Sequence, residues 1–304
     1  MSKKAFLFPG QGSQYVGMLK DFYEKSSEAK EIIEQAEEAI SFKLTEVMFN
    51  GPEDALKQTD VTQPAIFLHS VVVNSFLKNI KPDAVAGHSL GEYSALVATG
   101  AIDINSGIKL VRFRGQFMLQ AGIEKPGTMA AIIGLEQTTL ENICMEASKE
   151  GIVQCANFNS PGQVVISGSV EGVLKGMELA KEAGAKIVKQ LVVSGAFHSP
   201  LMQSASDKLK EKLDETDFKD ASIPVYANVT AKPVTNSDEI RDLLLKQLNA
   251  PVRWAETIEN MINDGVDEFI EVGPGNVLQG LVKRINREVK FSGIDKYDQL
   301  ERFI

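Results

Sequence analysis

The 304-residue sequence predicts an α/β fold: a larger domain with a mostly parallel sheet, and a small domain inserted into it. Two observations predict this arrangement. Short apolar runs alternate with segments of helical periodicity through residues 1–125 and 196–304, which is typical of parallel strands covered by helices. Within residues 126–195 the order changes to βαββαβ, the ferredoxin-like split unit. We therefore expect one large domain built from both outer segments and one small domain between them.

The N-terminal part of the large domain is predicted to contain two buried strands. Lys4–Phe8 is a short apolar run that leads into the loop Pro9–Gln14, and Asp83–Gly87 follows Pro82. Helical periodicity, a serine cap or a closing glycine marks the helices around these strands. These predicted helices are Ser26–Ile40, Gln63–Asn79, Gly91–Thr99 and Asp103–Ala121, the last closed by Gly122.

The same signals give the remaining elements. In the small domain the predicted strands are Thr128–Ile133, Ile152–Asn157, Gln163–Ser167 and Lys186–Val193, and the predicted helices are Leu135–Lys149 and Val170–Ala183. In the C-terminal part the predicted strands are Pro224–Val229 and Glu268–Val272, and the predicted helices are Ser204–Asp214, Ile240–Leu248, Ala255–Asp264 and Val277–Asn286.

Composition narrows the possible partners and the compartment. The net charge of −9 argues against nucleic acid or an anionic membrane as the main partner. The apolar run Ala5–Phe8 is too short for the core of a signal peptide, and Pro64–Val73 is too short to span a membrane. Cys144 and Cys155 lack the spacing of a metal site and favour a reducing compartment. We expect a cytoplasmic protein, monomeric by default, with no metal site.

A serine between two glycines is the strongest single indication of chemistry. Gly87-His-Ser-Leu-Gly91 lies between a predicted strand and a predicted helix, which is the context of the nucleophile elbow in α/β-hydrolase-like folds. A sharp turn there needs small flanking residues, lifts the Ser89 hydroxyl above the sheet and aims the Leu90 amide at an attacked carbonyl. The alternative is an ordinary glycine-rich turn. The flanking strand and helix favour Ser89 as a nucleophile.

A serine nucleophile needs a base, and the sequence contains three histidines. His88 adjoins Ser89, but consecutive residues at a tight turn point in different directions, so we expect it to pack or hydrogen-bond nearby. His69 lies within an apolar helical segment and is predicted to be a core histidine. His198 lies in a turn after the last small-domain strand, where a rigid edge often presents catalytic groups. His198 is therefore the predicted base.

Arg114 interrupts the apolar face of its predicted helix. At about 3.6 residues per turn, Arg114 falls inside the apolar arc, whereas Arg112 falls outside it. The arc comprises Ile104, Ile108, Leu110, Val111, Phe117 and Met118. A guanidinium on a buried face stays protonated and needs an anionic partner. That partner is either an internal Asp or Glu, or a carboxylate that the substrate brings to the serine.

The loop Pro9-Gly-Gln-Gly-Ser-Gln14 is rich in glycine but lacks the residues of a phosphate loop. It has no Gly-Lys-Ser/Thr, and Tyr15 stands where a dinucleotide fingerprint needs glycine or alanine. Because the loop follows the first strand near the carboxyl edge of the sheet, the Gln11 amide is a candidate second oxyanion donor. The alternative is an ordinary tight turn.

Several short motifs follow one another from end to end of the chain, each weak alone and specific together. They are Phe8-Pro-Gly-Gln-Gly-Ser-Gln14, Gly87-His-Ser-Leu-Gly-Glu92, Arg114-Gly115, Asn157-Phe-Asn-Ser-Pro-Gly162, Gly195-Ala-Phe-His198, Asn228-Val-Thr230, Gln247 with Pro251-Val-Arg-Trp254, and Val272-Gly-Pro-Gly275. In this combination the chain resembles the malonyl-CoA:acyl carrier protein transacylase family over essentially its whole length. One departure is Gly195, where many members of the family have histidine or another residue.

The resemblance implies a ping-pong acyl transfer. Ser89 would attack the thioester of malonyl-CoA while His198 takes the proton, and the amides of Gln11 and Leu90 would hold the oxyanion. The phosphopantetheine thiol of acyl carrier protein would then take the malonyl group from the serine ester. The coenzyme A thioester is thus a substrate, and no permanently bound cofactor is expected.

The resemblance also implies roles for the residues around the acyl group. Arg114 would clamp the malonyl carboxylate in a two-pronged ion pair. Gln247 occupies the position at which the family orients its histidine through a backbone or amide carbonyl. Phe197, Asn159 and His88 are expected to line the pocket, and a bulky residue at Phe197 goes with malonyl rather than methylmalonyl.

The sequence leaves the pathway and the acceptor open. A discrete polyketide-synthase acyltransferase would use the same chemistry, and the resemblance alone favours fatty-acid biosynthesis. A serine thioesterase would use the same nucleophile and base, and it would differ in admitting water. A non-catalytic scaffold that binds the carrier would have a broken nucleophile or base, yet both Ser89 and His198 are present.

Overall fold

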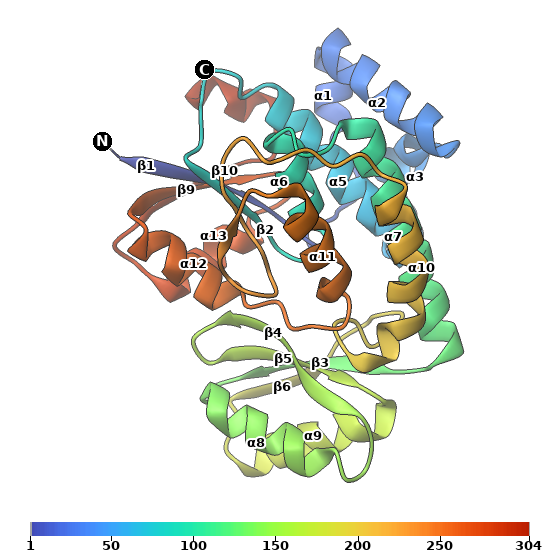
Figure 1. Ribbon diagram of the computed structural model, residues 1–304, viewed down its shortest axis with the longest axis vertical. Coiled ribbons are helices and arrows are strands. Elements are labelled where there is room, and N and C mark those ends of the chain that lie inside the picture. Colours follow the sequence, from blue (N-terminus) through green and yellow to red (C-terminus); the bar gives the residue numbers. More distant parts are fainter. Residues whose placement is uncertain (1, 304) are drawn as a thin grey trace.

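The computed structural model describes residues 2–303, and within that range the strands form two separate sheets (Figure 1). The larger sheet has the strand order β10-β9-β1-β2-β7-β8. Its strands are β1 (Lys3–Phe8), β2 (Ala84–Gly87), β7 (Val225–Tyr226), β8 (Pro233–Val234), β9 (Val266–Val272) and β10 (Lys290–Ile294). Every neighbouring pair is parallel except β7 and β8, which are antiparallel. The predicted α/β fold with a mostly parallel sheet is confirmed.

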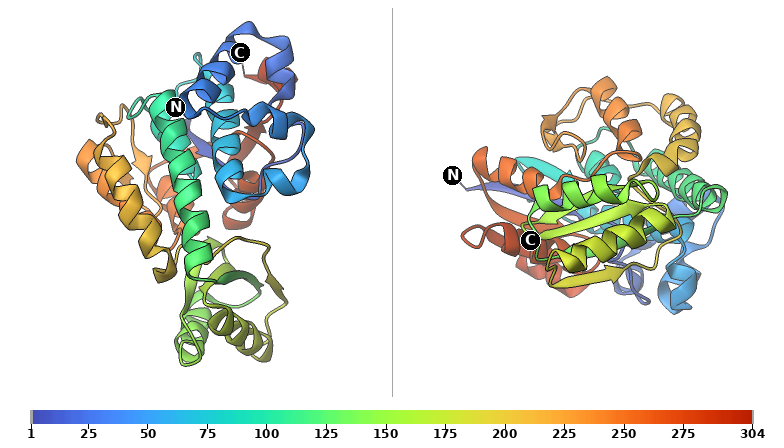
Figure 2. Two further views of the ribbon diagram at one scale, coloured as in Figure 1. Left: turned by 90° about the vertical axis from the view of Figure 1, so that its right-hand side faces the viewer. Right: turned by 90° about the horizontal axis from the view of Figure 1, so that it is seen from below.

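Helices cover the larger sheet on both faces and the smaller sheet on its outer face (Figure 1). They are α1 (Lys20–Lys25), α2 (Ser27–Ile40), α3 (Leu44–Asn50), α4 (Glu53–Leu56), α5 (Thr59–Ser75), α6 (Gly91–Ala98), α7 (Ile104–Glu124), α8 (Gln137–Ala147), α9 (Val170–Glu182), α10 (Gln203–Asp214), α11 (Ser237–Gln247), α12 (Trp254–Asn263) and α13 (Val277–Ile285). Side chains of Ser26, Asp103, Ser169 and Asn236 cap the N-termini of α2, α7, α9 and α11. The long helix α7 runs along the molecule toward the smaller sheet (Figure 2, left).

Alternation along β1 explains why helices are needed on both sides of this sheet. Successive side chains of a strand point to opposite faces. Phe6 and Phe8 belong to the core that contains residues of α5, α6 and α7. Ala5 and Leu7 belong to the core that contains residues of α12 and α13. The strand is thus buried on both faces, and its carboxyl end delivers the glycine-rich loop to the middle of the molecule.

The smaller sheet has the strand order β4-β5-β3-β6, with all pairs antiparallel. Its strands are β3 (Thr128–Ile133), β4 (Val153–Ser160), β5 (Gln163–Gly168) and β6 (Ile187–Gln190). With α8 after β3 and α9 after β5, the chain follows the predicted βαββαβ order. These elements lie within the predicted small domain, residues 126–195. The boundaries of the two domains remain a prediction.

The helix predicted at Gln63–Asn79 is found at Thr59–Ser75, so that Pro64 lies inside it. Proline lacks the amide hydrogen that residue 64 would donate to the carbonyl of Asp60. Arg112 of α7 donates to that carbonyl instead, and its guanidinium also pairs with the Asp60 carboxylate at 3.1 Å. A side chain from another helix thus satisfies the carbonyl, and local periodicity does not reveal such a contact.

Gly122 does not close α7 as the sequence predicts, because the helix continues to Glu124. The glycine instead allows another segment to approach closely. A Cβ atom on Gly122 would lie 2.0 Å from the Ser194 carbonyl oxygen and 3.1 Å from the Gly195 Cα atom. Gly195, the departure from the family pattern, therefore lies where the segment leading to His198 crosses α7.

Other differences concern short or partly exposed elements. The sequence analysis does not predict α1, α3, α4, β8 or β10. The strand predicted at Lys186–Val193 is found at Ile187–Gln190, and Leu191 and Val193, which follow it, line a cleft. The strand predicted at Pro224–Val229 shortens to the two residues of β7.

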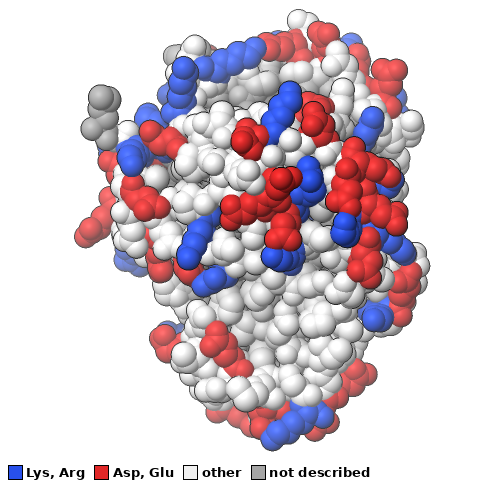
Figure 3. Space-filling model, in the orientation of Figure 1, with Lys and Arg blue, Asp and Glu red and all other residues white. Residues whose placement is uncertain are grey.

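Both signs of charge are interspersed on the face of the molecule in Figure 3. The lower centre of this face, at the level of β4 and β5 in Figure 1, is mostly uncharged. Among residues 2–303, no helix has the length and apolar character needed to cross a membrane.

Candidate active site

A cleft of about 280 Å³ is lined from the ends of β1 and β2 and from strands β3, β4 and β5. It therefore lies where the carboxyl edge of the larger sheet meets the smaller sheet. Most of the predicted site residues line it, namely Gln11, His88, Ser89, Leu90, Arg114, Asn159, Phe197 and His198. Within residues 2–303, no group of three or more His, Cys, Asp or Glu is placed to hold a metal ion.

Ser89 forms a strained turn between β2 and α6. Its φ of 51° lies in the left-handed region, which costs a non-glycine residue about 1–3 kcal/mol. Small neighbours permit the turn, since a Cβ atom on Gly87 would lie 1.9 Å from the carbonyl carbon of Gly91. Asn228 ties the turn together: its Oδ1 accepts from the Ser89 amide and its Nδ2 donates to the Gly87 carbonyl, each at 2.7 Å. The backbone strain is therefore supported by a dedicated side chain.

Two neighbours orient the Ser89 hydroxyl. Its Oγ lies 2.8 Å from Nε2 of His198 and 3.0 Å from Nη2 of Arg114. Because a guanidinium can only donate, Oγ accepts from Arg114 and its own hydrogen points to His198. The positive charge beside Oγ also stabilises the negative charge that develops as the proton leaves. The arrangement is that of a nucleophile and its base.

Main-chain carbonyls hold His198 in one tautomer. Its Nδ1 donates to the Gln247 carbonyl oxygen at 2.8 Å and lies 3.2 Å from that of Ala250, which leaves Nε2 as the acceptor. Burial, together with the nearby charge of Arg114, lowers the pKa of His198 to about 3. The imidazole is therefore neutral near pH 7. The carbonyl that orients it belongs to the main chain of Gln247, whereas the Gln247 side chain contacts Arg114.

Arg114 is 1% exposed, in agreement with its place on the apolar arc of α7. Its Nη1 donates to Oε1 of Gln63 at 2.7 Å, and its Nη2 donates to Oε1 of Gln247 at 3.0 Å. Within the described range, no carboxylate forms an ion pair with the guanidinium, and its Nε has no hydrogen-bond partner. Burial lowers the pKa of Arg114, but arginine starts so high that it stays charged. The sequence analysis left two possible partners for Arg114, an internal Asp or Glu and a substrate carboxylate. No internal acid is in direct contact with it among the described residues.

The amides of Gln11 and Leu90 are the predicted donors of the oxyanion hole. Both residues line the cleft with Ser89, and neither amide donates a backbone hydrogen bond in the part of the chain described. Leu90 precedes α6, and the first amides of a helix have no partner within it. The two segments are close together, since a Cβ atom on Gly10 would lie 2.3 Å from the His88 carbonyl oxygen.

The other two histidines have different surroundings. Nε2 of His88 lies 2.9 Å from Oδ1 of Asn159, and its ring lies 5.4 Å from that of Trp254. Burial lowers the pKa of His88 and keeps it neutral. His69 is buried in α5, with Nε2 2.9 Å from the Asp295 carbonyl oxygen, and its Nδ1 has no partner among the described residues. His69 is thus a core histidine, as the apolar segment around it predicts.

Three further residues of the site carry no role in the sequence analysis, namely Gln63, Glu92 and Asn228. Glu92 is 3% exposed, and burial raises its pKa to about 7. Its signal in the sequence is a carboxylate on a mostly apolar helix, one turn after Ser89. Asn228 lies inside the strand predicted at Pro224–Val229, and it follows a strand only because β7 ends at Tyr226, so its position carries no clear signal in the sequence. Gln63 has no comparable local signal.

Comparison with known proteins identifies the class of this chain. The family model for the acyl transferase domain matches residues 5–297, nearly the whole chain. The fold, the elbow and this match define the chain as an acyltransferase.

Individual relatives narrow the class. The chain is 47% identical to malonyl CoA-acyl carrier protein transacylase of Bacillus subtilis, over 99% of this chain and 96% of that protein. An acyl carrier protein S-malonyltransferase structure from Vibrio cholerae superposes with a TM-score of 0.95 at 43% identity, covering 100% of both chains. A malonyl-transacylase in complex with a type II PKS acyl-carrier protein gives 0.96 at 40% identity, covering 99% of both. The chain belongs to the malonyl-CoA:acyl carrier protein transacylase family, as its motifs predict.

Proposed function

We infer that this protein transfers the malonyl group of malonyl-CoA to the phosphopantetheine thiol of acyl carrier protein, in fatty-acid biosynthesis. The observation that carries the proposal is the position of Arg114. A buried guanidinium without a carboxylate in direct contact lies 3.0 Å from Oγ of Ser89. An acyl group attached to Ser89 therefore meets a positive charge within the length of a malonyl unit.

In the first half-reaction, Ser89 Oγ attacks the thioester carbonyl and Nε2 of His198 takes its proton. The carbonyl oxygen becomes an oxyanion, and the amides of Gln11 and Leu90 stabilise it. The carbon–sulfur bond then breaks, and the coenzyme A sulfur leaves with the proton from His198. A malonyl ester on Ser89 remains.

In the second half-reaction, the carrier thiol gives its proton to His198 and attacks the same ester carbonyl. Collapse of the oxyanion returns the proton to Ser89 Oγ and leaves malonyl on the carrier. A neutral carbonyl orients His198, so the imidazole is less basic than one held by a carboxylate. The first half-reaction tolerates this because a thiolate is a good leaving group, and the second because a thiol gives up its proton more readily than a hydroxyl.

The acyl group is recognised at its free end. When malonyl binds, the guanidinium can turn its fork from Ser89 Oγ to the two carboxylate oxygens, and the unpartnered Nε supplies a further donor. Phe197 is buried and lines the cleft, which limits the space for a branched acyl unit. Acetyl lacks the carboxylate and gains none of this binding.

Whether the malonyl group passes to the carrier or to water distinguishes the proposed transferase from a thioesterase. Protein loaded with malonyl-CoA should carry a malonyl ester by intact-mass spectrometry, and addition of carrier bearing phosphopantetheine should move the label to the carrier. We expect transfer to exceed release of free malonate on the order of 100-fold, which requires the cleft to keep water from the ester before the carrier arrives. Release of malonate at an equal rate would favour the thioesterase.

The low pKa of His198 predicts the pH dependence of acylation. A base with the ordinary histidine value of 6.5 would be lost to protonation below that pH. Burial favours the neutral form, so protonation needs a lower pH and the acid limb moves downward. We expect kcat/KM for malonyl-CoA to change less than about twofold between pH 8 and about pH 5.5.

Rapid-quench measurement of acylation across this range checks the prediction. Burial raises the pKa of Glu92, which lies behind the cleft, to about 7, so this carboxyl also titrates in the range, and the Glu92→Gln variant removes it. An acid limb centred near 6.5 in both proteins would contradict a neutral, buried base.

The remaining proposals follow from the family. We propose that the protein acts in the cytoplasm, as a monomer, without a permanently bound cofactor, on carrier of the fatty-acid pathway. A discrete polyketide-synthase acyltransferase is the second candidate. Comparison of kcat/KM with carrier proteins of the two pathways distinguishes them.

A further inference from the structure

Glu92 is a buried carboxylate in the site that the proposed reaction does not use. It lies on α6, one turn after Ser89. One of its oxygens, Oε2, accepts hydrogen bonds from the Asn228 amide at 3.0 Å and from Nε2 of Gln247 at 2.9 Å. Among residues 2–303, no basic side chain forms an ion pair with it. A buried carboxylate is costly unless its partners compensate, so its position needs a reason.

The Gln247 side chain stands between Glu92 and Arg114. Its Nε2 donates to Glu92 and also to the Ser89 carbonyl oxygen at 3.0 Å, while its Oε1 accepts from Arg114. An amide can present either its oxygen or its nitrogen to a neighbour. Because Glu92 Oε2 accepts only from a donor, it fixes the nitrogen on its own side. The oxygen of Gln247 must then face the guanidinium.

This arrangement has two consequences for Arg114. If the Gln247 amide were reversed, its NH₂ group would face the N–H groups of the guanidinium, and repulsion between these donors would displace Arg114. The Glu92 carboxylate is also held one amide away from the guanidinium, so it does not occupy the position that a substrate carboxylate requires. Gln63 Oε1 holds the other side of the fork at 2.7 Å.

We propose that Glu92 is a positioning residue for acyl selection: through the Gln247 amide, it holds the Arg114 guanidinium in place for the malonyl carboxylate. The proposal rests on the proposed function. The atom that performs this role is Oε2, which accepts the hydrogen bonds from the Asn228 amide and the Gln247 side chain. The negative charge of Glu92 is not required for this role.

Two single variants separate the acceptor oxygen from the charge. Glu92→Gln keeps an oxygen in place for both donors and removes the charge. Glu92→Asp keeps the charge, but its oxygen is withdrawn by one methylene and cannot reach both donors. The readout is the ratio of Ser89 acylation rates with malonyl-CoA and acetyl-CoA. Both acyl groups depend on Arg114 through the Ser89 hydroxyl, but only malonyl also depends on it for its carboxylate. A general structural defect would lower both rates together.

We expect Glu92→Gln to keep the malonyl-to-acetyl ratio within about twofold, the error with which independent effects add. Glu92→Asp should lower this ratio by about 10- to 100-fold, as a misplacement of about 1 Å can do. In a Gln247→Met background the Glu92→Asp change should alter the ratio by less than about twofold, since the intermediary is gone. The main-chain carbonyl that orients His198 is kept in that background.

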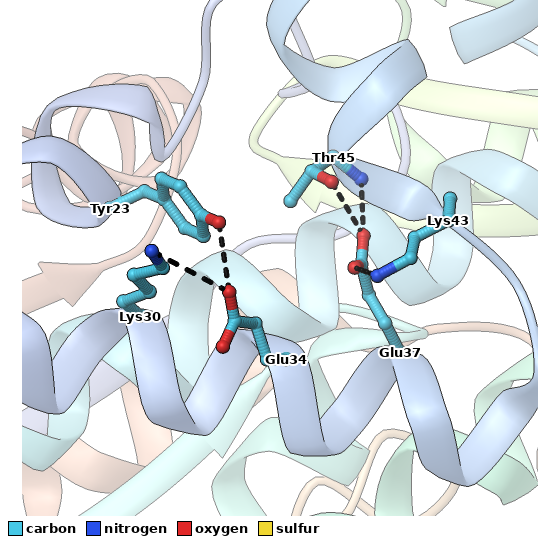
Figure 4. A network of polar contacts seen from close by, with 6 residues as sticks. All are labelled: Tyr23, Lys30, Glu34, Glu37, Lys43 and Thr45. Carbon is cyan, nitrogen blue, oxygen red and sulfur yellow. Dashed lines mark hydrogen bonds and ion pairs between the residues drawn. The ribbon is translucent and has the colours of Figure 1, made fainter.

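Glu37 provides a matched control (Figure 4). It is also 3% exposed, and it accepts from the amide and the hydroxyl of Thr45 at 2.7 Å each and from Lys43 at 2.9 Å. It lies on α2, with Tyr23 and Glu34 nearby (Figure 4). It does not line the cleft. Glu37→Asp should lower the melting temperature and leave the ratio unchanged.

Three results would overturn the proposal. They are an unchanged ratio in Glu92→Asp, an equal loss in Glu92→Gln, and a full effect of Glu92→Asp without the Gln247 side chain. Failure of the unsubstituted protein to form a malonyl ester would instead overturn the proposed function, so the two are tested separately in one assay.

Discussion

Replacement of Ser89 by alanine should abolish the acyl-enzyme and lower the transfer rate on the order of 10⁶-fold, as loss of a serine nucleophile does elsewhere. The substitution removes the atom that forms the ester. His198 and the cleft amides remain, but they have no oxygen to activate. Mass spectrometry after brief exposure to malonyl-CoA should show unmodified Ser89→Ala protein, while the unsubstituted protein gains one malonyl group.

Ser94 supplies the control for this experiment. It is a fully buried serine five residues further along the chain, on α6, and it does not line the cleft. Ser94→Ala should acylate normally. A labelled ester that persists in Ser89→Ala would assign the nucleophile to another residue.

The parts of the site that sequence could predict are those with a local pattern. Ser89 stands between Gly87 and Gly91, a spacing typical of a sharp turn between a strand and a helix. Arg114 is conspicuous because helical periodicity places a permanent charge on an apolar arc. Such signals depend on a few neighbouring residues and one kind of secondary structure.

The parts that it could not predict depend on contacts between distant elements. Glu92 and Gln247 are 155 residues apart in sequence, and the orientation of the amide follows only from the donors and acceptors around it. Gly122 has the sequence context of a helix end, yet its function is to admit the chain at Ser194. The edge strand β10 has only half-buried and exposed side chains before Ile294, so its apolar signal is weak.

Replacement of Arg114 by alanine should remove the preference for malonyl. The substituted cleft lacks the cation proposed to pair with the malonyl carboxylate, and loss of one partner of a buried pair costs about 3–5 kcal/mol. This corresponds to a fall in kcat/KM for malonyl-CoA on the order of 10²- to 10⁴-fold. Acetyl-CoA brings no carboxylate, so its rate should fall less, and acetyl should become a competing substrate.

Glu92 makes this variant informative for a second reason. Arg114 favours the charged form of Glu92 and so opposes the rise in its pKa caused by burial. Without the guanidinium that pKa should rise further, and Glu92 should be protonated at pH 7 rather than left as an uncompensated charge. The variant is therefore expected to fold, and its altered substrate choice can be measured.

Arg112 is the neighbouring control, because it lies on the same helix outside the cleft and pairs with Asp60. Arg112→Ala removes the donor to the carbonyl that Pro64 leaves free, so it should lower the free energy of unfolding. It should leave the malonyl-to-acetyl ratio unchanged. The guanidinium beside Ser89 can select malonyl only through its charge, so removal of that charge must change the ratio. If Arg114→Ala kept the ratio as well, the guanidinium would not be the carboxylate clamp.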